Sequence, residues 1–350
     1  MDLFWTIPSA DDLTPTDPLG LDAMRDELAD KLVPCLTGRT QSHEDFYWCL
    51  AFVGWSSQCP SEKLRITRFL NYERWLKLCW FNKGRKGFAG FRQAKIQGSE
   101  KGAPIKRFAR LLKNQRFQGL LGAHLSPLRS IALIHPDSLA LTKDGARLVE
   151  GAGAPLRDQE LPDSDWDKWQ QRFAKAARGF GAVFKRDLRE RLEAAMPWLA
   201  EALARSGWSQ CQGWTQIADS LPPDRAPYAR LAGEFIDWAS RVRNYFERIA
   251  TGHSPESLSY PARLRASIPK DLKHWKVFKA EFSRWNPKDV PAALARIHKK
   301  VFLDRGYSES DLWIELQDGE LRWKKGRAND EPHPEGSDCR WSNAVKLLKH

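Results

Sequence analysis

Apolar residues recur at helical spacing along most of the chain, and this pattern predicts a mainly α, multi-helical fold. In the first amphipathic stretch, residues 21–32, the apolar side chains fall on one helical face. The next stretch, residues 43–55, is apolar and aromatic almost throughout, which predicts a buried helix. We expect the following helices, given by residue numbers: 21–32, 43–55, 61–82, 166–177, 182–205, 228–250, one or two between 270 and 300, and 341–348.

Near the C-terminal end, a pattern of short strands replaces the helical spacing. Residues 311–316 and 320–324 predict two strands, and Asp318-Gly319 between them is typical of a tight β-hairpin turn. A loop rich in Gly and Pro at 150–162 divides the chain. We therefore expect a helical domain at 1–155 and a second helical domain at 160–350 that ends in the β-hairpin and a short helix.

The segment from about 100 to 152 contains a second predicted hairpin. One helix is expected after Pro104 and another at about 118–130, in which Pro127 either kinks the helix or starts a shorter one. The apolar run 131–134 predicts a strand, and 135–138 predicts a turn.

A return strand is expected at 139–141, with Leu133 facing Leu141 across the hairpin. Thr142 is then expected to cap a further helix. The order helix, helix, strand, turn, strand, helix is the layout of a winged helix. The fold prediction is therefore mainly α, with a winged-helix-like segment and a C-terminal β-hairpin.

The stretch LRSIALIHPDSLALTKDGARLVE resembles the wing of bacterial winged helix-turn-helix proteins. The opening DPLGLDAMRDELADKLVPCLTGRTQSHEDFYWCL is similar to bacterial proteins of phage-defence or mobile-element type. The winged-helix resemblance covers about 50 of the 350 residues and implies a helix laid in the major groove of DNA. It implies no catalytic residue.

The net charge of the chain indicates the kind of partner it binds. There are 56 Lys and Arg against 44 Asp and Glu, which gives a net charge of +12. A chain this basic is expected to bind an acidic partner. Between residues 82 and 116 there are eleven Lys or Arg and one acid, Glu100. The candidate nucleic-acid-binding residues are Lys83, Arg85, Lys86, Arg92, Lys106, Arg107, Arg110, Lys113, Arg116 and Arg129.

Several classes of site have no signal in the sequence. There is no apolar run long enough to span a membrane and no signal-peptide pattern, so we expect a cytoplasmic protein that makes no membrane contact. The six cysteines lack the paired spacing of a zinc site, and neither a phosphate-binding GxxxxGK[ST] loop nor a GxSxG nucleophile motif is present. We therefore expect no cofactor, no metal and no catalytic residue.

Three hypotheses follow. The first is a non-catalytic subunit that binds nucleic acid, DNA rather than RNA, within a bacterial multi-protein system such as anti-phage defence. The second is a subunit of an RNA-guided ribonucleoprotein complex. The third is a nuclease with a diverged C-terminal site, in which Asp311 and Glu315 would share one face of a strand near Lys324.

Overall fold

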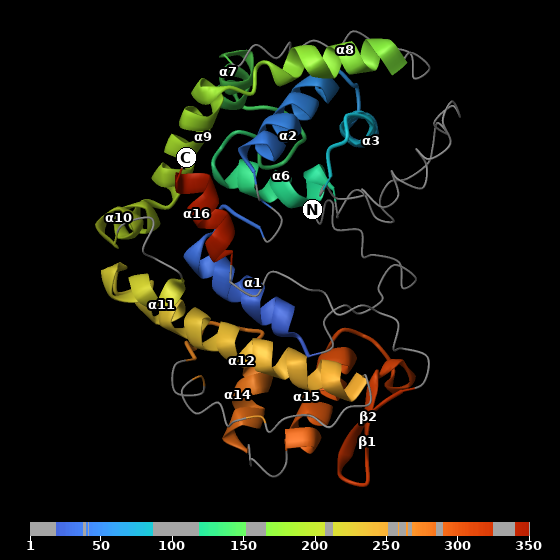
Figure 1. Cartoon of the computed structure of the whole chain (residues 1–350), viewed down its shortest axis with the longest axis vertical. Coiled ribbons are helices and arrows are strands. Elements are labelled where there is room, and N and C mark those ends of the chain that lie inside the picture. The colour runs from blue at the N-terminus through green and yellow to red at the C-terminus, as the bar shows by residue number, and fades with distance from the viewer. Residues whose placement is uncertain are drawn as a thin grey trace. The chain divides into compact units, whose positions relative to one another are not determined.

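The computed structural model describes residues 19–37, 40, 42–86, 119–151, 166–206, 213–250, 258, 264, 268–284, 290–324 and 340–349. Within these residues the chain is mainly α, as the hydrophobic pattern predicts, with one two-stranded sheet (Figure 1). None of the helices in these ranges is both long enough and apolar enough to cross a lipid bilayer.

The chain divides into two compact units, and neither is continuous in sequence. Unit 1 consists of Met1–Val33 and Glu201–Trp341, and unit 2 consists of Pro34–Ala200 and Ser342–His350. The chain therefore passes from one unit to the other at three points. This grouping differs from the single boundary near 155–160 that the loop composition predicts, and that loop lies outside the described residues.

Most of the described helices of unit 2 begin or end at residues that the sequence favours for that position. Ser42 and Ser61 cap α2 and α3, and each hydroxyl accepts a hydrogen bond from a backbone N–H in the first turn. The predicted helix at 182–205 is split at Met196, because Pro197 disfavours helical geometry in the residue before it. The helices are α2 (His43–Ser56), α3 (Glu62–Asn82), α6 (Leu120–Ser130), α7 (Lys143–Gly151), α8 (Trp166–Ala177) and α9 (Ala182–Ala195), followed by α10 (Pro197–Ser206), which crosses the unit boundary, and α16 (Trp341–Lys349).

The core of unit 2 is an aromatic cluster around α2. The rings of Trp75 and Trp169 stack with centroids 5.9 Å apart, and Phe52 meets Phe69 edge to face at 5.5 Å. Such ring pairs add to the free energy gained from burying apolar area. The described tryptophans of this unit therefore serve mainly as core residues, which agrees with the ordinary interpretation of a Trp-rich helical protein.

Pro127 lies inside α6 without ending it. A proline lacks the N–H that would bond to the carbonyl four residues earlier, which here belongs to Ala123. That carbonyl instead accepts a hydrogen bond from the Thr37 hydroxyl at 2.9 Å. The side-chain donor thus offsets the missing backbone bond, and the helix continues to Ser130.

The predicted wing strands at 131–134 and 139–141 are reduced to one antiparallel bridge, between Ile134 and Leu141. The expected pairing of Leu133 with Leu141 is therefore wrong by one residue. The reason is the end of α6: Ala132 takes a left-handed conformation with φ 56°, and the N–H groups of Leu133 and Ile134 both bond to Leu128 O. Residues 131–133 cap the helix, and few remain for a strand. The turn and the Thr142 cap of α7 are confirmed.

Gly145 in α7 lies against the backbone of this hairpin. A Cβ at this position would come within 2.1 Å of Leu133 O, a backbone atom that cannot move without disturbing the hairpin. We expect Gly145→Ala to lower the free energy of unfolding, measured by urea denaturation, by about 1–2 kcal/mol, because the clash exceeds the helix-propensity gain of Ala.

The matched control is Gly151→Ala at the end of the same helix, where a Cβ would meet nothing within 4 Å. This change should leave stability unchanged or raise it by up to about 1 kcal/mol. Equal effects at the two glycines would contradict the close approach of α7 to the hairpin.

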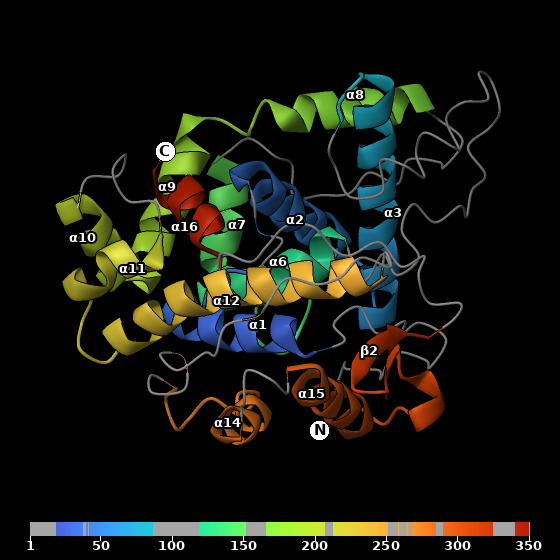
Figure 2. The ribbon, with the colours of Figure 1, turned by 60° about the horizontal axis from the view of Figure 1, so that its bottom comes forward.

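Unit 1 is organised around its longest described helix, α12 (Ala226–Ala250). The helix α1 (Leu21–Leu32) packs along α12, and the two lie side by side in Figure 2. Close packing against α12 also occurs at Gly233, where an added Cβ would meet the Thr215 side chain. The remaining elements are α11 (Trp214–Ile217), the 3-10 helix η2 (Ala218–Ser220), α14 (Lys276–Ser283), α15 (Val290–Asp304), the 3-10 helix η4 (Glu309–Asp311), β1 (Ile314–Gln317) and β2 (Glu320–Trp323).

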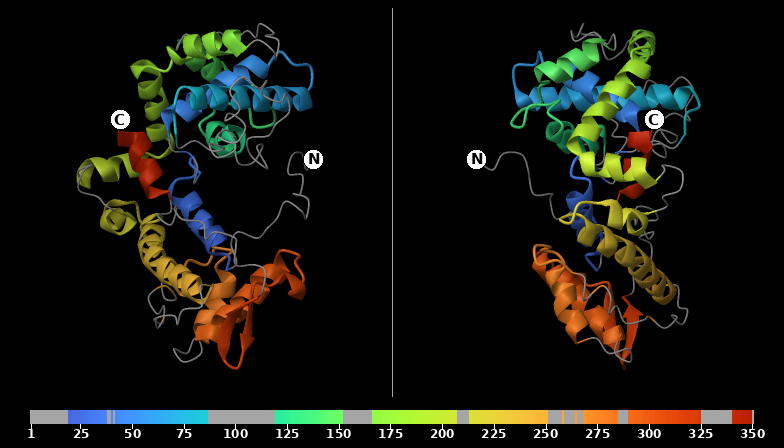
Figure 3. Two further views of the ribbon diagram at one scale, coloured as in Figure 1. Left: turned by 45° about the vertical axis from the view of Figure 1, so that its right-hand side comes forward. Right: turned by 90° about the vertical axis from the view of Figure 1, so that its left-hand side faces the viewer.

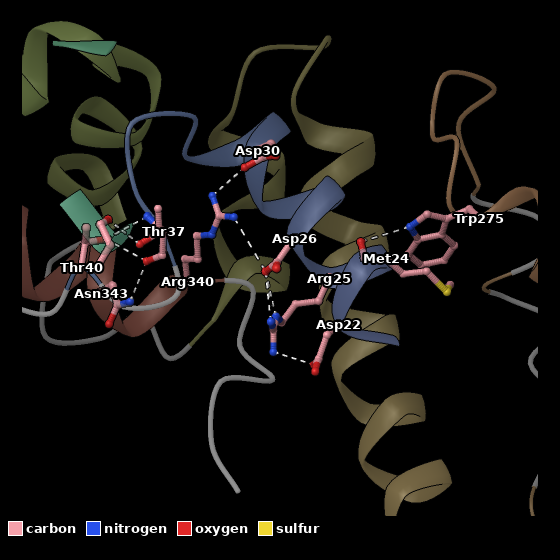
Figure 4. Close-up of polar contacts among 11 residues, drawn as sticks. Asp22, Met24, Arg25, Asp26, Asp30, Thr37, Thr40, Trp275, Arg340 and Asn343 are labelled. Carbon is pink, nitrogen blue, oxygen red and sulfur yellow. Dashed lines mark hydrogen bonds and ion pairs between the residues drawn. The ribbon is translucent and has the colours of Figure 1, made fainter. Parts of the chain in front are cut away.

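Polar contacts attach α1 to later parts of unit 1 (Figure 4). Arg340 Nη1 lies 2.7 Å from Asp30 Oδ1, and its Nη2 lies 3.7 Å from Asp26 Oδ1. The indole Nε1 of Trp275 donates to Met24 O at 3.2 Å. The N-terminal helix is therefore held by residues roughly 250 and 310 positions further along the chain.

The C-terminal hairpin is confirmed with the predicted Asp-Gly turn. β1 and β2 pair antiparallel, and Asp318 and Gly319 both have positive φ, at 55° and 81°, as a tight hairpin turn requires. The first strand begins later than expected, because Asp311 lies in η4. The expectation that Asp311 and Glu315 share a face of one strand is therefore wrong.

Candidate nucleic-acid interface

The positive charge of the chain is concentrated in unit 2. By sequence, unit 2 contains 31 Lys and Arg against 16 Asp and Glu, whereas unit 1 contains 25 against 28. Unit 2 therefore carries a net charge of +15 and unit 1 a net charge of −3. An acidic ligand would be attracted to unit 2 and weakly repelled by unit 1.

The first three candidate residues, Lys83, Arg85 and Lys86, lie together where α3 ends. Gly84 has φ 76°, its N–H bonds to Phe81 O, and the N–H of Arg85 bonds to Trp80 O. These bonds are the paired contacts of a glycine-terminated helix, which fix the direction in which the chain leaves α3. Lys83 and Lys86 are exposed at this point, and the rest of the basic segment follows them in sequence.

Arg85 is more constrained than a free surface cation. Its Nη1 lies 2.9 and 3.0 Å from the two carboxylate oxygens of Glu44, and its guanidinium carbon lies 3.8 Å from the centroid of the Trp80 ring. Part of its charge is thus offset by a carboxylate, and the ring contact further restricts its side chain. We interpret Arg85 as an anchor at the start of the basic segment more than as a free phosphate ligand.

Arg129 lies apart from the other three described candidates. Its Nε donates to His135 O, in the hairpin that follows α6, at 3.1 Å. This hairpin also contacts the first residue of α3, because Leu139 N donates to Glu62 Oε1 at 2.8 Å. Lys83 is at the opposite end of that helix, about 30 Å away at the usual helical rise. The structure therefore does not bring Arg129 together with Lys83, Arg85 and Lys86.

The helix that the winged-helix resemblance would place in the DNA groove is α6, directly before the hairpin. Arg129 is its one cation, and Gly122, Ser126 and Ser130 are its exposed residues. The remaining candidates, together with the helix expected after Pro104, lie outside the described residues: Arg92, Lys106, Arg107, Arg110, Lys113 and Arg116.

A second group of cations was missed in the sequence. Lys175 and Arg178 lie at the end of α8, and Lys185 lies in the first turn of α9. The three therefore flank the corner between these helices, which Figure 3 draws in yellow-green. All three side chains are exposed, and no carboxylate of the described residues comes within 4.0 Å of them. The Lys185 ammonium lies 4.9 Å from the centroid of the Phe180 ring. The spacing of these three cations around a predicted short turn could have identified them from the sequence.

A buried ionic cluster joins α3 to α6. Lys77 Nζ lies 2.5 Å from Glu73 Oε1, which also accepts a hydrogen bond from Leu120 N at 2.8 Å, and both charged side chains are at most 3% exposed. One turn further along α6, His124 Nδ1 lies 3.1 Å from Leu120 O. Burial lowers the pKa of His124 to about 4. The Glu73 carboxylate thus caps the N-terminus of α6 and fixes that helix on α3.

These groups do not resemble a nucleophilic or metal site. Burial, followed by the charges of Glu73 and Asp45, raises the pKa of the neighbouring Cys49 thiol, and a protonated thiol is a poor nucleophile and ligand. Within the part of the chain that the structure describes, no three His, Cys, Asp or Glu side chains are placed to hold one metal ion. In the C-terminal hairpin, Lys324 Nζ donates to Glu309 O at 3.2 Å, and Glu315 pairs in register with Arg322.

No protein-family model matches the chain, and comparison with curated proteins and with solved structures gives no significant match.

Proposed function

We propose that unit 2 binds the phosphate backbone of nucleic acid, and that the ligand is double-stranded DNA. The observation that carries this proposal is the distribution of charge: the whole positive excess lies in one compact unit, and the other unit is slightly acidic. Neutralising phosphates with Lys and Arg releases counterions and supplies most of the affinity in such complexes. The exposed cations at the end of α3 and at the α8–α9 corner support the same interpretation.

We also propose that the chain acts without catalysis, in the cytoplasm, as one subunit of a bacterial multi-protein system, with anti-phage defence as its context. The similarity of residues 17–50 to bacterial proteins of phage-defence or mobile-element type supports this context. Base reading through α6 is a smaller part of the proposal, because one cation is available on that helix.

A binding experiment with charge-neutralised variants tests the function. Replacing Lys83, Lys86, Arg107 and Arg110 by Gln should weaken binding to a DNA duplex at least about tenfold at low salt. The slope of log K against log salt should flatten by about one for each phosphate that the variant no longer neutralises. Arg85 is left in place because it bonds to Glu44.

The control removes the same number of charges from unit 1. It replaces four exposed cations that already contact carboxylates in the structure, at 2.6–3.1 Å, and we call it the paired-cation control: Arg205→Gln, Arg230→Gln, Arg241→Gln and Lys299→Gln. An equal loss of affinity in both variants, with circular dichroism unchanged, would contradict binding through unit 2. Stronger binding of RNA than of duplex DNA would favour the ribonucleoprotein hypothesis. Metal-dependent DNA cleavage that disappears in Glu315→Ala would favour the nuclease hypothesis.

A further inference from the structure

Unit 1 is slightly acidic as a whole, yet it exposes a regular row of lysines. Lys270, Lys273, Lys276 and Lys279 follow one another at intervals of three residues through the turn before α14 and along that helix, which is labelled in Figure 1. We call these four residues the lysine row. All four are exposed, and the N–H of Lys276 bonds to Lys273 O at 3.3 Å, so the turn leads directly into the helix.

The fold holds the backbone of this row in place. The side chains of Leu272, Trp275 and Phe278 alternate with the lysines and are at most 1% exposed, so they anchor the opposite face in the core. Glu27 of α1 accepts hydrogen bonds from the backbone N–H groups of Lys273 and His274. The row is therefore presented on a fixed backbone, which reduces the entropy cost of binding an extended ligand.

Among the described residues, the lysines of the row have no carboxylate partner. No carboxylate of these residues lies within 4.0 Å of any ammonium group of the row, whereas nearby Lys299 is paired with Glu309 at 2.6 Å. The one acid within the row, Asp271, is already engaged by Lys31 Nζ at 2.6 Å and by the Tyr228 hydroxyl at 2.9 and 2.8 Å. The four exposed ammonium groups thus remain for an external anion.

The chemistry of the row favours phosphate over a protein or membrane partner. Lys is depleted in the cores of protein interfaces, and a membrane-bound helix needs exposed apolar side chains beside its cations. Among the side chains of unit 1 whose exposure the structure describes, the exposed large apolar ones are Leu303 of α15 and Leu316 of β1, and neither lies in the lysine row. A lysine ammonium is a compact point charge that suits phosphate contacts without reading bases.

We propose that the lysine row is a second contact surface for the nucleic-acid backbone, in addition to the cations of unit 2. This inference rests on the proposed function of the chain. Two surfaces on one chain that bind the same nucleic acid raise its affinity beyond that of either surface alone, because the second contact forms at a high effective concentration. The contact is independent of base sequence.

The test compares four forms of the full chain on one labelled DNA duplex at several salt concentrations. They are the wild type, the unit 2 variant described above, the paired-cation control, and a row variant with Lys270, Lys273, Lys276 and Lys279 replaced by Gln. The row variant and the paired-cation control remove the same charge from the same unit, so only the position of the charge differs. We expect the row variant to bind at least about fivefold more weakly than the paired-cation control and to have a salt slope smaller by about one for each phosphate left without a lysine.

The outcomes separate this inference from the proposed function. If the row variant and the paired-cation control have equal affinity and equal slope while the unit 2 variant loses binding, the row is an ordinary solvated surface and the inference is overturned. If the wild type shows no salt-dependent binding to nucleic acid, the proposed function itself fails. A row variant that loses affinity and keeps the wild-type circular dichroism and unfolding midpoint supports the second surface.

Discussion

Replacing Glu73 by Gln is expected to lower the free energy of unfolding by about 3–5 kcal/mol, the usual cost of leaving a buried charge without its partner. Gln can still accept the hydrogen bond from Leu120 N, so the helix cap is retained in part. The variant lacks the negative charge beside Lys77, whose side chain is 3% exposed.

Urea denaturation at neutral pH measures this loss of stability. The double variant Glu73→Gln with Lys77→Met removes both charges and should recover most of the stability, because no buried charge remains unpaired. The exposed pair Glu201–Arg205 provides the control, since both side chains are about two-thirds exposed and Glu201→Gln should cost less than about 0.5 kcal/mol. A loss as small for Glu73→Gln as for Glu201→Gln would show that water reaches the buried pair.

The second large expected effect is a loss of stability at low pH, caused by the buried imidazole of His124. Because burial lowers the pKa of His124 from 6.5 to about 4, the folded chain keeps this imidazole neutral in a pH range where the unfolded chain protonates it. Its contribution to stability is complete above about pH 6.5 and is lost as the pH falls through about 4. Between about pH 7.5 and pH 4.5 we expect His124 alone to remove about 2–3 kcal/mol of stability.

The measurement is the difference between the unfolding free energies at those two pH values. In His124→Gln this difference should shrink by about 2–3 kcal/mol, whatever the change in packing against Phe46, whose ring centroid is 5.0 Å away. The charges that face the ring, Glu73 and Lys77, are unchanged in this variant. The control His274→Gln replaces an exposed imidazole and should leave the wild-type response in place. An unchanged pH response in His124→Gln would contradict the buried neutral imidazole.

Local pattern predicted most of the described helices, because apolar spacing and capping residues act within a few positions. The predicted stretch 21–32 coincides with α1, and the predicted stretch 61–82 matches α3 to within one residue. The two wing strands were predicted to be longer than they are, for a reason that the sequence pattern cannot show. An apolar run such as 131–134 suits either a strand or a buried helix end, and here Leu128 O accepts the two N–H groups that a strand would need.

The candidate site was harder to predict than the fold. Glu73 and Lys77 are four residues apart on a helix, a spacing that usually marks an exposed surface pair, and only the packing of α6 on α3 turns them into a buried anchor. Likewise, the positions of Lys83 and Arg129 at opposite ends of α3 depend on how the helices pack. Charge counts along the chain locate a basic segment but not the surface that its residues share.

The discontinuous units also bear on how the chain is made. The helix α1 belongs to unit 1, yet the rest of that unit begins at Glu201, after all of Pro34–Ala200 has been synthesised. At about 5–20 residues per second, a ribosome needs on the order of 10–30 s to make that intervening stretch. During this interval the apolar face of α1, with Met24, Leu28 and Leu32, has left the ribosome without the helices that later bury it. Newly made chains should therefore be a substrate for chaperones that bind nascent polypeptides until Arg340 is synthesised and can reach α1.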